Sequence, residues 1–151
     1  MRCEIAVDID SCPDHVWAVI TDLNRWPRWT TAVRDAALLG GGTLALHGVV
    51  RLRAPHLPER TWRVAEFAAR RHRFALRNEG IGGRADVRFA LFPTGVSRTR
   101  LVVTHERVGW LGTPVARFTA RTVQGNLQLL GADLKAHCET RRRSGVAAPA
   151  G

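Results

Sequence analysis

The chain has 151 residues, and its 23 lysines and arginines against 13 acidic residues give a formal charge of +10. Its composition, 45% apolar and 24% charged, is that of a globular protein and excludes a largely disordered chain. The sequence shows no run of roughly 18 apolar residues and no apolar signal core, so we expect a cytoplasmic protein without a membrane span. Its three cysteines, Cys3, Cys12 and Cys138, lack metal-ligand spacing and suit free thiols in a reducing compartment.

The first elements follow from an alternating run and a helix-start signal. Residues 3–10 place apolar side chains on one face, which predicts a half-buried strand. Residues 11–14 combine a capping residue, a proline and an acid, which predicts the start of a helix. The residues expected to face inward from this helix are Val16, Trp17 and Ile20. A second short helix or turn is expected through residues 24–29, where Pro27 limits its extent.

Extended runs separated by Gly, Pro and Asn replace the helical period in the middle of the chain. The predicted strands are residues 32–39, 44–53, 60–68, 72–78, 84–92 and 98–106. Their short connections predict antiparallel pairing. A last helix of about 40 Å is expected from about residue 114 to 140. We therefore expect one domain over residues 1–140 and a basic, flexible tail over residues 141–151.

Several segments resemble the START-like SRPBCC superfamily, often labelled polyketide cyclase/dehydrase. They are PDHVWAVITDLNRWPRW at residues 13–29, VRLR at 50–53, PHLP at 55–58, WRV at 62–64 and GADLK at 131–135. The resemblance covers about residues 3–140 and implies an α+β helix-grip fold. In that fold a curved seven-stranded antiparallel sheet, with two short helices after strand 1, wraps a long carboxy-terminal helix over an apolar cavity. Such a cavity implies binding and does not specify a reaction.

Alternation divides each predicted strand into a cavity face and an outer face. The strand residues expected at the cavity are Val50, Leu52, Trp62, Val64, Phe74, Leu76, Asn78, Val87, Phe89, Leu91, Leu101, Val103 and His105. Trp26 and Trp29 are expected near one mouth, and Leu127, Leu130 and Leu134 as the helical wall. This apolar face predicts binding of a small hydrophobic, polyketide- or lipid-like ligand, although a plain core has the same composition.

The polar exceptions on that face are Asn78, His105 and Glu66, of which His105 and Glu66 are the catalytic candidates. An imidazole titrates near neutral pH, so His105 can act as a general acid or base or orient a ligand oxygen. It can equally be satisfied by a neighbouring backbone group, and Glu66 can be a solvated acid at a strand end. His105 and Glu66 are expected to lie three strands apart, at a distance of about 14 Å, so they form no hydrogen-bonded dyad.

An enzyme, a polyketide cyclase, aromatase or dehydratase using the same cavity, is the alternative to a binding protein. The resemblance implies that aromatase/cyclases use inward Arg, Tyr and Trp side chains, but this chain has no tyrosine. Along the strand after Trp62 the inward residues include no arginine, which puts cyclase chemistry in doubt. No phosphate loop or nucleophile elbow occurs. Consecutive helical residues such as His137-Cys138-Glu139 cannot converge on one ion, so we expect neither metal nor organic cofactor.

Arginine supplies all of the basic residues except Lys135. Nine arginines alternate onto the face opposite the cavity: Arg51, Arg53, Arg63, Arg73, Arg77, Arg84, Arg88, Arg98 and Arg100. This face can dock an acidic, acyl-carrier-like protein, or it can reflect coding bias. Binding of nucleic acid is the third hypothesis, ranked last because no recognition helix or aromatic platform accompanies the charge. The cavity is expected to be almost uncharged, so the net charge says nothing about the ligand.

Overall fold

The computed structural model describes residues 1–80, 83–109 and 113–147. Within them the strands are β1 (Arg2–Ile9), β2 (Asp35–Leu39), β3 (Val49–Arg53), β4 (Arg60–Ala68), β5 (Arg73–Gly80), β6 (Gly83–Gly95) and β7 (Arg98–Val108). The helices are α1 (Pro13–Thr21), α2 (Trp26–Trp29) and α3 (Thr113–Ala147), with short 3₁₀ turns η1 (Leu23–Arg25) and η2 (Ala69–Arg71).

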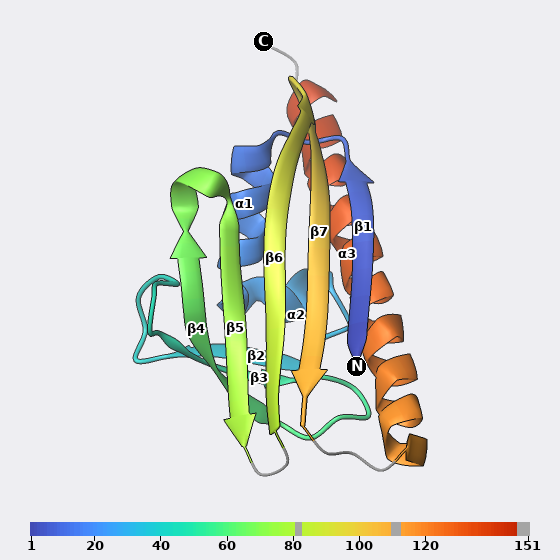
Figure 1. Ribbon diagram of the computed structural model, residues 1–151. Coiled ribbons are helices and arrows are strands. Elements are labelled where there is room, and N and C mark those ends of the chain that lie inside the picture. The colour runs from blue at the N-terminus through green and yellow to red at the C-terminus, as the bar shows by residue number, and fades with distance from the viewer. Residues whose placement is uncertain (81–82, 110–112, 148–151) are drawn as a thin grey trace.

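The strands form one antiparallel sheet in the order β1-β7-β6-β5-β4-β3-β2. Figure 1 shows all three α-helices on one side of this sheet, with α3 running behind β1 and β7. The predicted helix-grip fold is confirmed.

The central register is the one expected from folding the hairpins about their turns. His105 pairs with Val87, Val87 with Leu76, and Leu76 with Val64. Because directly paired residues share a face of the sheet, these four side chains form one row on the helix side.

Two of the expected strands begin later than predicted. Residues 32–34 precede β2, and the backbone amide of Ala32 donates to the Thr30 hydroxyl at 3.1 Å in a local turn. Residues 44–48 precede β3, because His47 has a φ of 70° and the Gly48 amide donates to the Ala45 carbonyl at 3.0 Å. Left-handed backbone at His47 is incompatible with a continuous strand.

Helix α3 extends beyond its expected end at residue 140 and ends at Ala147. The backbone of residues 141–147 is therefore helical, and residues 148–151 lie outside the described part of the chain. The flexibility expected for this tail stays a prediction. Within the described ranges, no helix is both long and apolar enough to cross a membrane.

Two contacts fix α3 to the rest of the molecule. A Cβ built on Gly131 would lie 2.7 Å from Val7 Cγ2, so the helix approaches β1 more closely than any side chain would allow. Two residues later, Asp133 Oδ2 accepts a hydrogen bond from the buried Thr30 hydroxyl at 2.8 Å. The second contact ties the segment after α2 to the helix and so positions one wall of the cavity.

Candidate functional site

A cavity of about 280 Å³ lies between the sheet and α3. Nine of the residues expected at the cavity line it: Trp26, Leu52, Trp62, Leu76, Val87, Phe89, His105, Leu127 and Leu130. They come from α2, five strands and the long helix, so distant parts of the chain meet around one space.

The other residues expected at the cavity are absent from its wall. They are Trp29, Val50, Val64, Phe74, Asn78, Leu91, Leu101, Val103 and Leu134. Seven of these nine, all except Trp29 and Asn78, belong to the buried core, and helix α1 packs against part of that core. Trp17 of α1 contacts Phe74 edge-on with ring centroids 5.7 Å apart, and Phe74 stacks on Phe89 at 4.6 Å. The cavity therefore occupies only one end of the space between the sheet and helix α3.

Trp29 and Asn78 are occupied by other contacts. The indole of Trp29 stacks on His137 of α3 with centroids 6.1 Å apart. The Asn78 amide donates to the Thr61 carbonyl at 2.8 Å, and its oxygen accepts from Arg60 Nη1 at 3.5 Å. Asn78 thus links two strands and does not line the cavity wall.

Glu66 was expected on the cavity face, and the register of β4 corrects this. A β-bulge lies between Val64 and Glu66, and it shifts the alternation by one residue. Glu66 consequently pairs with Ala75 on the outer face, while Phe67 pairs with Phe74 on the helix side. Glu66 cannot share the cavity with His105.

His105 is the buried titratable group of the cavity wall, with 8% of its surface exposed. Burial, followed by the positive charge of Arg107, lowers the pKa of His105 to about 4. Its Nδ1 is buried and has no hydrogen-bond partner. The imidazole is therefore neutral at pH 7 and offers one free polar atom beside the cavity.

The cavity also contains residues that the sequence interpretation missed. Those from loops, strands and the helix are Ala32, Val33, Ala54, Leu57, Pro58, Arg60, Ala85, Arg107, Thr119, Val123 and Asn126. Continued alternation could have found four of them, because each lies two residues from a predicted cavity residue on the same strand run: Ala54, Arg60, Ala85 and Arg107. The expectation of an almost uncharged interior is therefore wrong, because two arginines, Arg60 and Arg107, line the cavity. The other loop residues leave no periodic signal in the sequence.

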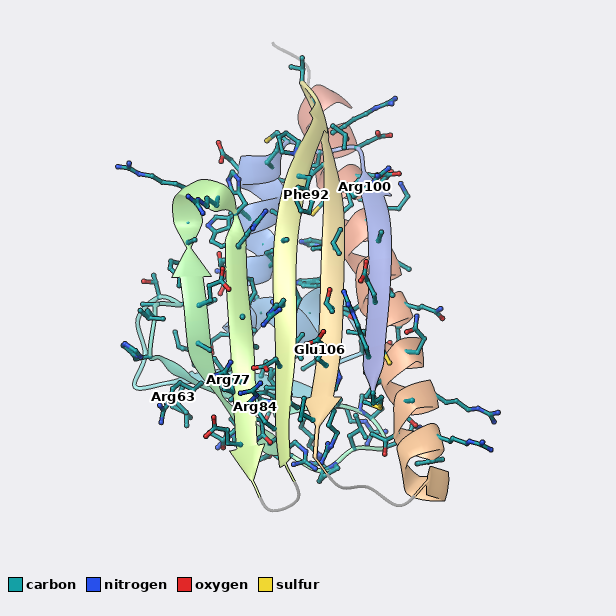
Figure 2. The ribbon with its side chains drawn as sticks, viewed as in Figure 1. Arg63, Arg77, Arg84, Phe92, Arg100 and Glu106 are labelled. Carbon is teal, nitrogen blue, oxygen red and sulfur yellow. The ribbon has the colours of Figure 1, made fainter. Side chains whose placement is uncertain are left out.

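The arginines expected on the outer face do lie there, but they share it with carboxylates. Figure 2 shows Arg63, Arg77 and Arg84 on neighbouring strands of the face turned away from the helices. Asp86 lies between the last two, 2.7 Å from Arg77 Nε and 3.2 Å from Arg84 Nε. Ion pairs from the same face also include Arg51–Glu59, Arg98–Asp10 and Arg100–Asp8. Much of the outer positive charge is thus compensated locally.

In the part of the chain that the structure describes, no three His, Cys, Asp or Glu side chains are grouped as metal ligands would be. The three cysteines form no disulfide: Cys3 and Cys138 are buried, Cys12 is exposed, and burial raises the pKa of Cys3. The chemically distinct part of this site is consequently His105 with the guanidinium and amide groups near it.

A family profile described as "Polyketide cyclase / dehydrase and lipid transport" matches residues 2–139. Comparison with curated proteins finds no significant match. Among solved structures, the Zhui aromatase/cyclase from Streptomyces sp. R1128 is 21% identical with a TM-score of 0.77, covering 96% of this chain and 97% of that chain. A START superfamily protein from Mycobacterium smegmatis is 15% identical with a TM-score of 0.75, covering 92% and 97%.

A plant enzyme extends the range of similar structures. Norcoclaurine synthase from Thalictrum flavum, solved in complex with dopamine and hydroxybenzaldehyde, is 11% identical with a TM-score of 0.70, covering 90% of this chain and 84% of that chain. At these identities the structural likeness establishes the fold alone.

Proposed function

Because this chain belongs to the polyketide cyclase/dehydrase and lipid transport family, a branch of the START-like SRPBCC superfamily, we propose that its cavity binds a small, mainly apolar ligand. The observation that carries the proposal is the cavity of about 280 Å³, walled by apolar side chains from the sheet and α3. Ligand sites in proteins are concave, largely apolar and supplied with a few polar groups, and this cavity has each of these properties.

A cavity-filling substitution tests the proposal. Ala85 lies on β6, is buried and lines the cavity, so Ala85→Leu places three additional carbon atoms in the ligand volume. Ala90 lies on the same strand but pairs with Arg73 on the outer face, so Ala90→Leu is the matched control. The probe is N-phenyl-1-naphthylamine, an uncharged fluorophore whose emission increases in apolar surroundings.

We expect wild type and Ala90→Leu to bind the fluorophore with equal affinity, and Ala85→Leu to lose about tenfold or more. The loss follows because the added side chain occupies the space that the ligand would fill. Circular dichroism and thermal unfolding verify that both variants fold. Equal binding by all three proteins would place the ligand elsewhere and contradict the proposal.

A catalytic role in the same cavity is the second candidate, a cyclase or dehydratase in which His105 acts as general acid or base. The unpartnered Nδ1 of His105 favours it, since a catalytic group needs an atom free to exchange a proton. Arg60 and Arg107 could polarise a substrate carbonyl from the same wall. Turnover of a β-diketone substrate that survives His105→Leu unchanged would exclude this mechanism.

Cytoplasmic location and a docked acidic protein remain proposals of secondary rank. Net positive charge supports an acidic partner in general terms. The ion pairs formed by five of the nine outer arginines reduce the charge available on that face. The same compensation weakens the nucleic-acid hypothesis.

A further inference from the structure

The wall of the cavity carries positive charge without a neutralising carboxylate. Arg60 and Arg107 both line it, and no aspartate or glutamate does so among the described residues. Neither arginine forms an ion pair within the described part of the chain. The nearby acids of β6 and β7, Asp86 and Glu106, lie on the outer face and pair there with arginines.

Hydrogen-bonding capacity is also unused around the same cavity. Arg107 Nε, Asn126 Nδ2 and His105 Nδ1 are buried and have no partner in the residues described. Arg107 and Asn126 can only donate through these atoms, and a neutral imidazole can donate through one nitrogen. A buried donor without a partner is costly, and a ligand oxygen reached by a rotation of these side chains toward the cavity would remove that cost.

The backbone holds these groups in place. Arg107 follows His105 on the helix side of β7, and its amide donates to the Met1 carbonyl at 2.8 Å. Its neighbour on β6 is Ala85, whose small side chain leaves the space above the sheet open to the guanidinium. Asn126 faces the cavity from α3, one turn from Leu130. Groups from the sheet and from the helix therefore border the same space.

We propose that the cavity binds the carboxylate of a small apolar acid at Arg107 and Asn126, with Arg60 of β4 adding positive charge from the same wall. The inference rests on the proposed ligand-binding function and adds the chemical class of the ligand. Arginine matches the two oxygens of a carboxylate through paired N–H groups, and such charge-assisted bonds are the strong ones. The apolar body of the acid lies against Trp62, Val87 and Leu127.

A carboxylate also accounts for the charge balance better than an uncharged ligand does. A ketone or alcohol would accept hydrogen bonds but leave two guanidinium charges near an apolar wall without a counter-charge. Once bound, an anion beside His105 would offset the positive potential of Arg107, which contributes to the low pKa of that imidazole. Binding of an acid, and not of a neutral analogue, should therefore raise the pKa of His105.

The test compares two ligands of similar shape, 2-naphthoate and uncharged 2-naphthalenemethanol, by isothermal titration calorimetry at pH 7.5. Arg107→Met removes the charge and retains a long apolar side chain. Arg98→Met is the matched control, because Arg98 lies on the same strand with an outer, exposed side chain. Arg60→Met provides a second variant from a different strand, and thermal unfolding checks that each protein is folded.

We expect wild type to bind naphthoate at least tenfold more tightly than the alcohol. Arg107→Met should weaken naphthoate binding about tenfold to a hundredfold and alter alcohol binding less than about threefold. Arg98→Met should change neither affinity. NMR titration of the His105 ring should show a raised pKa with naphthoate alone.

The possible failures are distinguishable. Equal binding of the acid and the alcohol, unaffected by Arg107→Met and Arg60→Met, would overturn the carboxylate inference and leave the proposed apolar-ligand function intact. If neither naphthoate nor the alcohol binds, and N-phenyl-1-naphthylamine also fails to bind, both the carboxylate inference and the proposed apolar-ligand function are contradicted. Equal weakening by Arg107→Met and Arg98→Met would show a general charge effect and would also overturn the inference.

Discussion

The groups around His105 disfavour its protonation. Burial contributes most, and Arg107 on the same strand and the amino terminus of Met1 add positive potential. A backbone hydrogen bond at His105 opposes them, and Asp86 on the outer face of β6 does so to a smaller extent. Cys3 pairs with His105 across β1 and β7, but burial raises its pKa, so the thiol supplies no negative charge at neutral pH. A neutral His105 is the consequence.

The low pKa of His105 predicts a specific loss of stability in acid. As pH falls from about 6.5 toward 4, the unfolded chain binds a proton that the folded chain does not, so the free energy of unfolding decreases. The expected loss is about 3 kcal/mol, complete near the folded pKa and absent above pH 7. Urea unfolding of wild type and His105→Leu across this range measures it, because the difference between them isolates His105.

An exposed histidine provides the control for this measurement. His56 lies in the β3–β4 connection with an exposed side chain, so His56→Asn should retain the wild-type pH dependence. If wild type and His105→Leu lose stability in parallel between pH 7 and 4, the imidazole of His105 is hydrated in the folded protein and its assignment to a dry cavity wall is wrong.

Individual residues were predictable where alternation continued without interruption. His105, Leu76 and Val87 followed from period 2 and from hairpin folding, and the register agrees. Glu66 failed because the bulge after Val64 reverses the faces of the residues that follow, and the apolar Phe67 beside Glu66 was the one sign of it in the sequence. Arg107 was missed for a different reason, since the strand was expected to end at residue 106 and the structure continues it to Val108.

At the level of elements, α3 depends on one close approach to β1. Gly131 leaves no room for a Cβ beside Val7 and Ile5, whereas Gly125 on the same helix has no atom within 4 Å of the corresponding position. Alanine favours a helix over glycine by about 1 kcal/mol at an unobstructed site. The two glycines thus have the same intrinsic propensity and different surroundings.

Alanine is expected to affect stability differently at the two glycines, Gly125 and Gly131. Gly125→Ala should raise the free energy of unfolding by up to about 1 kcal/mol, through helix propensity alone. The free energy of unfolding of Gly131→Ala should be at least about 1 kcal/mol lower than that of Gly125→Ala, because the added methyl group clashes with Val7 and Ile5. Chemical denaturation of both variants measures the difference. If both gain stability equally, α3 is not packed against β1 as closely as described.

The order of the strands and helices was predictable from the sequence, but the residues at which they begin and end were less predictable. Alternating and helical periods identified every strand and the long helix, and the resemblance supplied the way in which they pack. The beginnings of β2 and β3 depend on turns at Thr30 and His47, which are fixed by hydrogen bonds and backbone angles. The residues that line the cavity include Leu57 and Pro58 of the β3–β4 loop, which no periodic pattern identifies.

Across the whole molecule, positive charge is divided between an outer face that carboxylates compensate in part and a cavity wall that no described carboxylate lines. The outer ladder of Arg77, Asp86 and Arg84 is internally paired, whereas Arg60 and Arg107 face a space without carboxylates among the residues described. The net charge of +10 could not reveal this difference, because a composition gives the number of charges and not which arginines are paired with carboxylates. Two arginines near the cavity consequently bear more on ligand choice than the nine outside.

The most direct measurement of the central claim is the position of a bound apolar molecule. With N-phenyl-1-naphthylamine bound and the methyl groups labelled with ¹³C, intermolecular nuclear Overhauser effects should connect the probe to Leu76, Val87 and Leu127 of the cavity wall. The exposed methyl groups of Val96 and Leu46 should give none. Contacts to Val96 or Leu46 without contacts to the cavity methyl groups would contradict an internal ligand site.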